Sequence, residues 1–432
     1  MKHSSCLRSL LSFAVVLALV NVTAAEDWPQ WRGPTNDGIS TETGLPTTWS
    51  VTKGAMKNVA WVLELPGGGS STPIIWKNRI FLTAAEGKDL LLVCITTDGK
   101  LLWKKGVAKA VRGAVRKDEG NDASATASTD GKYVYTYFGS GDIACFDFDG
   151  NKVWGFNVQS RYGKFSIQHG MHITPLLHED RLYMALLTNG GHWVVALDKA
   201  TGNDAWKAAR PTDAVSESRE AYTSPVVWKN GNELNLVILG CDYATGHSLK
   251  DGAELWRLGD LNPGGGNKFN HRIITSPVAS ASELIVPTCR GLTVVALKQG
   301  AKGKIKTGSE FEQWRMPKGS PDVPSPLVKD GLVYLQRETL SMICVDLKSG
   351  KEFYNQRLTD GRYRGSPIYA DGKIYTVGRD SGVVSVLNAG AKFELLAQNK
   401  MGDVFTASPA VSQGRLYIRG FSTLYAISEG GK

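Results

Sequence analysis

The stretch TPLLHEDRLYMALLTNGGHWVVALDKATGNDAW (residues 174–206) contains the pattern that decides the fold. Its apolar runs are short: one follows Pro175, one covers 181–187, one covers 192–198, and another begins after Asn203. Gly, Asn and Asp separate the runs, as in antiparallel hairpins. Pro175 is compatible with a strand because the first residue need not donate to the ladder. The stretch therefore predicts a small four-stranded sheet.

The same pattern returns eight times along the chain. Seven copies begin at a Ser/Thr-Pro pair, namely Thr72-Pro73, Thr174-Pro175, Ser224-Pro225, Ser276-Pro277, Ser325-Pro326, Ser366-Pro367 and Ser408-Pro409. The eighth, Ser124-Ala125-Thr126, has Thr where Pro is expected. A strand-rich repeat of about 40–50 residues is typical of propeller blades, which bury their faces only against one another. We expect an all-β, eight-bladed β-propeller.

The two ends of the repeat region complement each other. The last copy stops at Lys432 without a fourth strand, while an unpartnered strand is expected at Asn58–Leu65, before the first copy. Pairing the two would close the ring and remove two exposed sheet edges. We expect the propeller to span 58–432, with its last blade completed by this N-terminal strand. Residues 26–57 are expected to be an extension that packs on the ring, clamped by Trp28 and Trp31.

Two positions that recur in the copies support their alignment. Fourth-strand aromatic residues are expected to fill the space between neighbouring blades; they are Trp103, Trp154, Trp206, Trp256, Trp314, Tyr354 and, as a looser match, Phe393. A third-strand position holds small residues, namely Cys94, Cys145, Ala196, Gly246, Ala296, Cys344 and Ala426, with Val386 as the larger occupant. We expect this position where blades crowd towards the axis.

The first 25 residues have the pattern of a secretory signal. Lys2 and Arg8 precede an apolar run, and small residues lead to an expected cleavage site near Ala25. The run is too short to span a bilayer, and Cys6 precedes it rather than marking a lipid-anchor site. We expect a periplasmic or secreted protein that neither spans a membrane nor carries a lipid anchor.

Charge and cysteine content exclude several classes of protein. The net charge is +9, or +7 without the leader, but basic residues are interspersed with acids and form no nucleic-acid-binding stripe. Five cysteines remain after the leader, three of them at equivalent positions of different blades, which argues against a disulfide framework. We expect no nucleic-acid partner, no structural zinc, and a monomer.

Repeated phrases of the form Ala-Leu-Asp-x-x-Thr-Gly-x-x-x-Trp, as at 196–206, resemble the pyrroloquinoline-quinone-like (PQQ-like) β-propeller superfamily over nearly the whole chain. Residues 27–34 resemble the opening of exported members from planctomycete-type bacteria. The resemblance implies a quinoprotein-like fold. It extends to the quinoprotein dehydrogenases, whose chemistry needs calcium, an Asp base and an aromatic floor, and to the Bam-complex propeller lipoprotein, a scaffold in outer-membrane protein assembly. The chain has no Cys-Cys pair of the kind found above many bound quinones.

The loops that lead into the first strands, called leading loops below, are expected to meet around the axis at one face. Four of them are polar and supply the candidate ligand-binding residues His169, His172, Arg219, Glu220, Asn270, His271, Arg272, Arg362 and Arg364. The loops 67–70, 322–324 and 403–405 are small or apolar. A basic, hydrogen-bonding funnel would suit an anionic or sugar-like ligand. Alternatively, these groups bond one another and buried water around the channel.

The sequence favours a binding or scaffold protein over an enzyme. There is no nucleophile elbow, and no carboxylate stands at metal-ligand spacing from the loop histidines. We therefore expect no catalytic residues, no metal and no cofactor, with a protein or polysaccharide partner at the funnel. The alternative is a PQQ- or metal-assisted oxidoreductase, in which Trp193 or Trp256 would have to serve as the aromatic floor.

Overall fold

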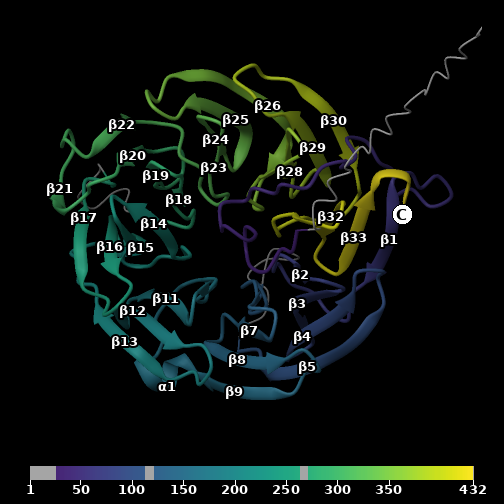
Figure 1. Cartoon of the computed structure of the whole chain (residues 1–432), viewed down its shortest axis with the longest axis horizontal. Helices are drawn as coiled ribbons and strands as arrows, with labels where there is room; N and C mark the ends of the chain where they lie inside the picture. The colour runs from purple at the N-terminus through teal and green to yellow at the C-terminus, as the bar shows by residue number, and fades with distance from the viewer. Residues whose placement is uncertain (1–25, 112–120, 263–270, 432) are drawn as a thin grey trace, which may run out of the picture.

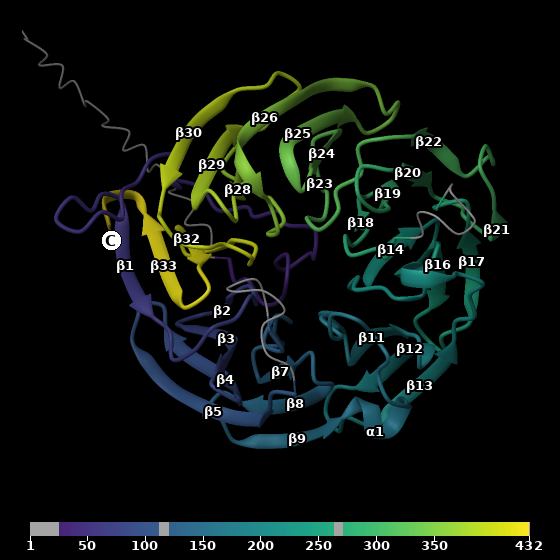
Figure 2. The same cartoon turned by 180° about the vertical axis from the view of Figure 1, so that it is seen from behind.

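The computed structural model describes residues 26–111, 121–262 and 271–431, so the expected leader at 1–25 lies outside the described residues. Within those ranges the chain forms eight sheets, arranged as blades around one axis (Figures 1 and 2). The predicted all-β, eight-bladed β-propeller is confirmed. No helix in the described part of the chain is long and apolar enough to cross a membrane.

Each blade is an antiparallel sheet whose first strand lies next to the axis (Figure 1). Blades 1 to 3 are β2 (Ile74–Trp76), β3 (Arg79–Glu86), β4 (Asp89–Thr96) and β5 (Leu101–Lys109); β6 (Ser128–Thr129), β7 (Tyr133–Tyr137), β8 (Asp142–Asp147) and β9 (Lys152–Asn157); and β10 (Leu176–His178), β11 (Arg181–Thr188), β12 (Gly191–Asp198) and β13 (Asp204–Ala209). A short helix, α1 (Val158–Tyr162), follows β9.

Blades 4 and 5 share an additional strand. They are β14 (Val226–Asn230), β15 (Glu233–Gly240), β16 (Tyr243–Ser248) and β17 (Glu254–Leu258); and β18 (Val278–Ala279), β19 (Glu283–Pro287), β20 (Val294–Lys298) and β22 (Glu312–Met316). The segment between β20 and β22 forms β21 (Gly303–Ile305), which pairs in parallel with β17. The outer edge of blade 4 is therefore covered by the chain itself.

The last three blades include the closure. Blades 6 and 7 are β23 (Leu327–Lys329), β24 (Leu332–Gln336), β25 (Thr339–Asp346) and β26 (Glu352–Arg362); and β27 (Ile368–Ala370), β28 (Lys373–Val377), β29 (Val383–Asn388) and β30 (Leu395–Lys400). Blade 8 is β31 (Ala410–Ser412), β32 (Arg415–Arg419), β33 (Thr423–Ser428) and β1 (Val59–Glu64), which pairs antiparallel with β33. The predicted closure by an N-terminal strand is confirmed.

Fourth-strand tryptophans join five pairs of neighbouring blades at the outside of the ring. Five indoles donate Nε1–H to a backbone carbonyl of the following blade over 2.8–3.1 Å: Trp61 to Thr97, Trp103 to Phe148, Trp154 to Lys199, Trp206 to Leu249 and Trp314 to Leu347. The glycine of the repeated Thr-Gly turn packs against the same indole, since a Cβ on Gly202 would lie 2.7 Å from Trp154. This contact, together with φ of +71° at Gly202, explains why the motif needs glycine.

The small third-strand residues lie opposite these aromatic residues, so our expectation that they mark crowding at the axis was wrong. Cys94 pairs with Trp103, and Ala426 pairs with Trp61 from β1. The position is small because the ring needs the space: a Cβ on Gly246 would lie 2.0 Å from Trp256 Nε1. In blade 7 the sizes are exchanged, because Val386 pairs with Ala397. The loose match of Phe393 to the fourth-strand position was therefore also wrong, since Phe393 precedes β30.

A belt of hydroxyl groups joins the blades next to the axis. The backbone N–H of each anchor Ser or Thr donates to the hydroxyl of the next anchor over 2.9–3.2 Å, in the order Thr72, Thr126, Thr174, Ser224, Ser276, Ser325, Ser366 and Ser408. The second copy was misaligned by one residue, because Thr126 takes the place of the Ser/Thr and Ala127 that of the proline. The repeated Ser or Thr of this motif thus forms seven hydrogen bonds of one kind between neighbouring blades.

The segment before β1 crosses the middle of the ring (Figure 1). Trp28 is fully buried and exchanges two backbone hydrogen bonds with Ile75 of blade 1. Arg32, also buried, donates to the carbonyls of Pro326 and Pro367 at the inner ends of blades 6 and 7. Trp49 then contacts blade 7 through its N–H, 2.9 Å from Asn399 Oδ1.

The belt can be tested at Ser276, whose hydroxyl accepts from Ser224 N. Ser276→Ala would leave that buried N–H without a partner, so we expect a loss of about 1–3 kcal/mol in the free energy of unfolding. Ser276→Thr keeps the oxygen, as Thr174 does in blade 3, and should lose much less. Urea unfolding measures both, and equal losses would show that the hydroxyl does not matter.

The closure can be tested by deleting residues 26–65. The deletion removes β1 and the buried Trp28 and Trp49, and each buried Trp lost costs about 3–5 kcal/mol. It also exposes the edge of β33, so we expect aggregation in size-exclusion chromatography. Replacing only the exposed loop 52–56 is the control and should leave a monomer. A soluble truncation with an unchanged melting temperature would contradict the role of β1.

Candidate functional site

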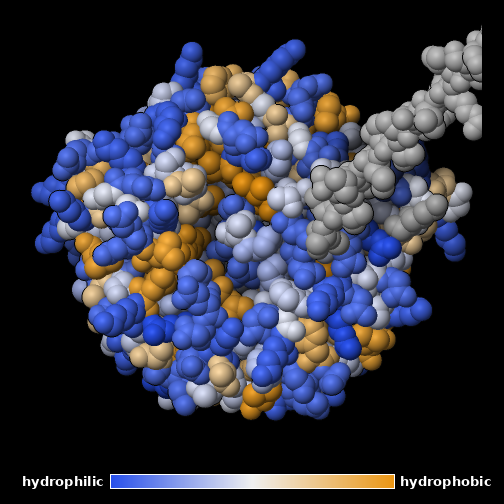
Figure 3. All heavy atoms as spheres, viewed as in Figure 1, coloured by the Kyte–Doolittle hydropathy of each residue, from blue (hydrophilic) through white to orange (hydrophobic). Residues whose placement is uncertain are grey.

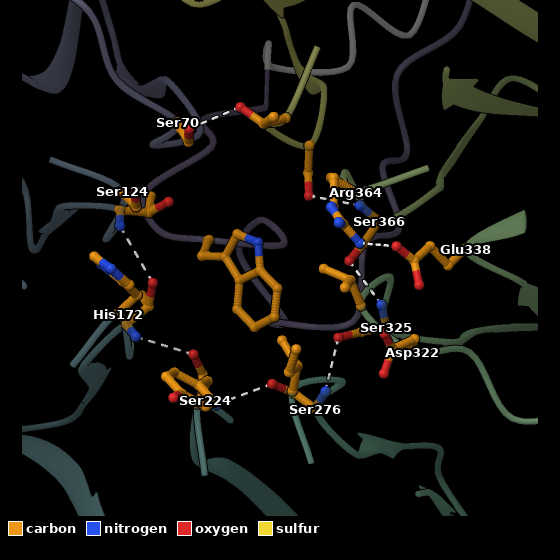
Figure 4. A pocket seen from close by; sticks show the side chains of 18 of the residues that line it. Ser70, Ser124, His172, Ser224, Ser276, Asp322, Ser325, Glu338, Arg364 and Ser366 are labelled. Atoms are coloured by element: carbon orange, nitrogen blue, oxygen red, sulfur yellow. Dashed lines mark hydrogen bonds and ion pairs between the residues drawn. The ribbon is translucent and has the colours of Figure 1, made fainter. Parts of the chain in front are cut away.

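A cavity of about 410 Å³ lies on the propeller axis. Its walls come from the leading loops, from the turns between the second and third strands of blades 5 and 6, and from Trp31 in the segment before β1. These two sets of loops meet at one face because an antiparallel second strand ends where the first begins. Figure 4 shows the anchor residues Ser224, Ser276, Ser325 and Ser366 around it, and the rim of the face seen in Figure 3 is mostly hydrophilic. The belt therefore lines the cavity as well as joining the blades.

Trp31 is the tryptophan that lines this cavity. It is partly exposed, and the neighbouring Arg32 fixes the chain to blades 6 and 7. Burial lowers the pKa of Arg32 to about 10, so the guanidinium stays charged at neutral pH. Trp193 and Trp256, the aromatic floors considered from the sequence, lie elsewhere, with Trp256 buried in blade 4. The side chain expected to act as a clamp thus offers an aromatic ring to the axis.

The arginines around the cavity are held in ion pairs. Arg272 Nη1 lies 3.3 Å from Glu217 Oε1, and Arg290 Nε lies 3.6 Å from Asp322 Oδ2. Arg362 Nε donates to Asp380 Oδ2 over 2.9 Å, and Arg364 donates to Glu338. Hydrogen bonds from Arg362, more than any other interaction, hold the pKa of Asp380 well below its usual range. The funnel is therefore much less basic than its arginines alone suggest.

Two carboxyl groups, Asp322 and Glu338, lie together on one side of the cavity (Figure 4). Asp322 belongs to a leading loop and is 4% exposed, while Glu338 lies in the turn between β24 and β25. Burial raises the pKa of Glu338, and contact with Asp322 raises it further, against the opposing effect of Arg364. A like charge nearby disfavours the ionised form of a carboxyl group, which is why Asp322 adds to the effect of burial on Glu338.

Five of the nine residues proposed from the sequence line the cavity: His169, His172, Arg272, Arg362 and Arg364. The others do not. Arg219 is exposed, and its carbonyl accepts from His192 Nε2. Glu220 is buried, where it accepts from Gln168 N, Asn189 and Tyr222. His271 pairs with Glu217 over 3.5 Å, and Asn270 lies outside the described residues.

Sequence reasoning missed Trp31, Tyr222, Arg290, Asp322 and Glu338, all of which line the cavity. The loop 322–324 was taken as small or apolar, which was wrong because Asp322 faces the site. Arg290 and Glu338 lie in turns between second and third strands, whereas the sequence prediction concerned only the leading loops. Their location could have been predicted from the sequence, because the alternation of strand directions places those turns at the same face as the leading loops.

The described residues contain no group of three or more His, Cys, Asp or Glu side chains that could hold a metal ion. The two cavity carboxylates are instead each in contact with an arginine. The five described cysteines are buried and free, and burial raises the pKa of Cys241 to about 12. The site therefore offers an aromatic face, hydroxyl groups and paired charges.

Comparison with known proteins identifies the family. The family model described as outer membrane protein assembly factor BamB matches residues 88–356 and 251–392. The chain belongs to this family of PQQ-like β-propellers. No curated protein matches the chain.

Solved structures support the fold. BamB from Moraxella catarrhalis is 14% identical, with a TM-score of 0.59, and the match covers 85% of this chain and 96% of that one. Quinohemoprotein alcohol dehydrogenase from Comamonas testosteroni is 13% identical, with a TM-score of 0.68, covering 96% and 82%. A computationally designed protein, Ika8, is 11% identical, with a TM-score of 0.59, covering 85% and 98%. Such distant matches show the architecture alone, so function must be argued from the site.

The Glu338–Asp322 pair predicts a dependence of stability on pH. Because the pKa of Glu338 is raised in the folded protein, that protein retains a proton which the unfolded chain releases. Between the ordinary and the raised pKa, the free energy of unfolding therefore falls as pH rises. Glu338→Gln removes this contribution, so its stability relative to the wild type should increase as the pH is raised from about 4 towards neutrality.

Urea unfolding across that pH range measures the difference. The exposed Glu233→Gln is the control and should track the wild type at every pH. A constant offset between Glu338→Gln and the wild type would show that Glu338 has an ordinary pKa.

Proposed function

We propose that the protein is an exported, non-catalytic binding protein whose axial cavity receives part of a protein or glycan partner. The cavity is the observation that carries this proposal. It has a volume of about 410 Å³, and it is lined by Trp31, by hydroxyl groups and by arginine side chains that form ion pairs with carboxylates. Its volume falls in the range of about 300–1,000 Å³ typical of ligand sites. An aromatic face beside a few fixed polar groups is the usual composition of such a site.

The rigidity of the lining supports binding. The belt ties neighbouring blades together next to the cavity, and between blades 5 and 6 an indole adds a second tie at the outside of the ring. Ion pairs hold the long arginine side chains in place before a ligand arrives. A preorganised site loses less conformational entropy on binding, so more of the contact energy appears as affinity.

The sequence pattern of residues 1–25 supports export, and membership of the BamB-described family supports a protein or envelope partner. Neither names the partner. We propose a periplasmic or secreted location. We also propose a monomer, because the ring closes on itself through β1 and each blade of the described residues is complete.

The quinoprotein alternative fits the site poorly. Trp31 could supply an aromatic floor, but a quinone with calcium would also need a cluster of oxygen ligands. Asp322 and Glu338, the carboxylates at the cavity, are each contacted by an arginine, whose charge opposes a divalent cation there. The residues therefore favour binding over a quinone centre. Adding PQQ and calcium to the purified protein, with no change in quinone absorbance, would agree with this assignment.

Val323→Trp tests the proposed function, because Val323 lines the cavity without belonging to the belt or to an ion pair. We expect the larger side chain to fill the cavity and abolish capture of a partner, in a glycan array and in a pull-down from envelope extract. Leu234→Trp, at an exposed position on β15, is the matched control and should bind normally. Equal binding by both variants would place the partner elsewhere on the ring.

A further inference from the structure

One polar atom of the cavity lacks the partner that its burial demands. Asp322 is 4% exposed, and its Oδ1 accepts no hydrogen bond within the described residues, while Oδ2 faces Arg290. An unsatisfied buried acceptor costs about 1–3 kcal/mol, and more when it is charged. Glu338 lies beside Asp322, and once it has lost its proton it supplies no donor to Oδ1. The site therefore has room for a hydrogen-bond donor from outside.

The charges around Asp322 limit which donor fits. A ligand anion would approach two carboxylates, and carboxylate, sulfate and phosphate groups only accept hydrogen bonds, so none could satisfy Oδ1. A ligand cation would approach Arg290 and Arg364. Either charged ligand would have to break an existing ion pair to find a counter-charge. A neutral donor avoids both costs.

A hydroxyl group meets the remaining requirements, since it donates and accepts at the same time. Arg272 offers the complementary donor, because its buried Nε–H has no hydrogen-bond acceptor among the described residues. Trp31 adds a partly exposed aromatic ring at the same cavity. Hydroxyl groups on a compact ring with an apolar face are the features of a sugar.

We propose that the axial cavity binds a neutral sugar unit, with one sugar hydroxyl donating to Asp322 Oδ1 and the sugar ring against Trp31. This inference rests on the proposed function and names its ligand class. Asp322 then determines specificity, because it selects a hydroxyl donor over the acid-bearing sugars that a basic funnel would favour.

The test compares sugars that differ by one charge. A glycan array should first find a neutral glycan that binds the full chain. Calorimetric titration then compares that glycan with its uronate and its amino-sugar counterparts. We expect the neutral glycan to bind at least about tenfold more tightly than either, because a lost charged-group hydrogen bond is worth about that factor. Its affinity should also change little with ionic strength.

Variants locate the contact. Asp322→Ala should weaken binding of the neutral glycan by about tenfold or more. Trp31→Ala should also weaken binding, and Trp31→Phe should retain part of it. The control is Asp204→Ala, which removes a carboxylate paired with Arg161 at the outside of the ring, and should bind as the wild type does. Melting temperatures of all variants show whether each is folded.

The possible outcomes separate this inference from the proposed function. Tighter binding of the uronate, or neutral binding unaffected by Asp322→Ala in a folded variant, would overturn the sugar assignment and leave the cavity as a site for another ligand. Failure to bind any glycan would also overturn the sugar assignment. Loss of protein capture in Val323→Trp would then still support the cavity, whereas no effect of Val323→Trp would overturn both proposals.

Discussion

The structure depends on one joint that is repeated around the ring. On the inside, the backbone N–H of one anchor residue donates to the hydroxyl of the next, as Ser276 N does to Ser325. On the outside, an indole donates to a carbonyl of the following blade, as Trp314 does to Leu347. A single blade has two open faces and cannot bury them alone. Where both parts are present, as between blades 5 and 6, the joint fixes neighbouring blades at both ends, and the hydroxyl belt lines the axial cavity.

The joint also explains why the fold could be predicted and much of the site could not. Ser/Thr-Pro, Thr-Gly and Trp recur because each joint needs the same atoms in the same places, so the repeat, the blade count and the closing strand are visible in the sequence. Asp322, Glu338 and Arg290 each occur once, in loops that the joint leaves free to vary. Their importance comes from meeting across blades, which no local pattern encodes.

The charge of the site also depends on contacts between loops that a local sequence pattern does not encode. Arg362 and Arg364 stand out in the sequence, and they suggest a basic funnel. Their partners Asp380 and Glu338 lie 18 and 26 residues away along the chain, in turns of blades 7 and 6. An arginine whose charge is matched by a fixed carboxylate positions a ligand more than it attracts one. Counting basic residues therefore overstates attraction of anions when the opposing acids come from other loops.

The junction between blades 8 and 1 differs from the others, and the difference follows from how the ring closes. There Arg419 donates to the carbonyl and hydroxyl of Ser71, and Thr406 Oγ1 donates to Ser70 Oγ over 2.7 Å. Burial lowers the pKa of Arg419 to about 9, so it stays charged at neutral pH. Its neighbour Gly69 has to be glycine, since a Cβ would lie 2.7 Å from the guanidinium. Sequence-adjacent blades can form their joints as the chain folds, but this one joins residues about 350 positions apart. A long, charged donor reaches both acceptors of Ser71 at once, which suits a contact that holds the two ends of the chain together.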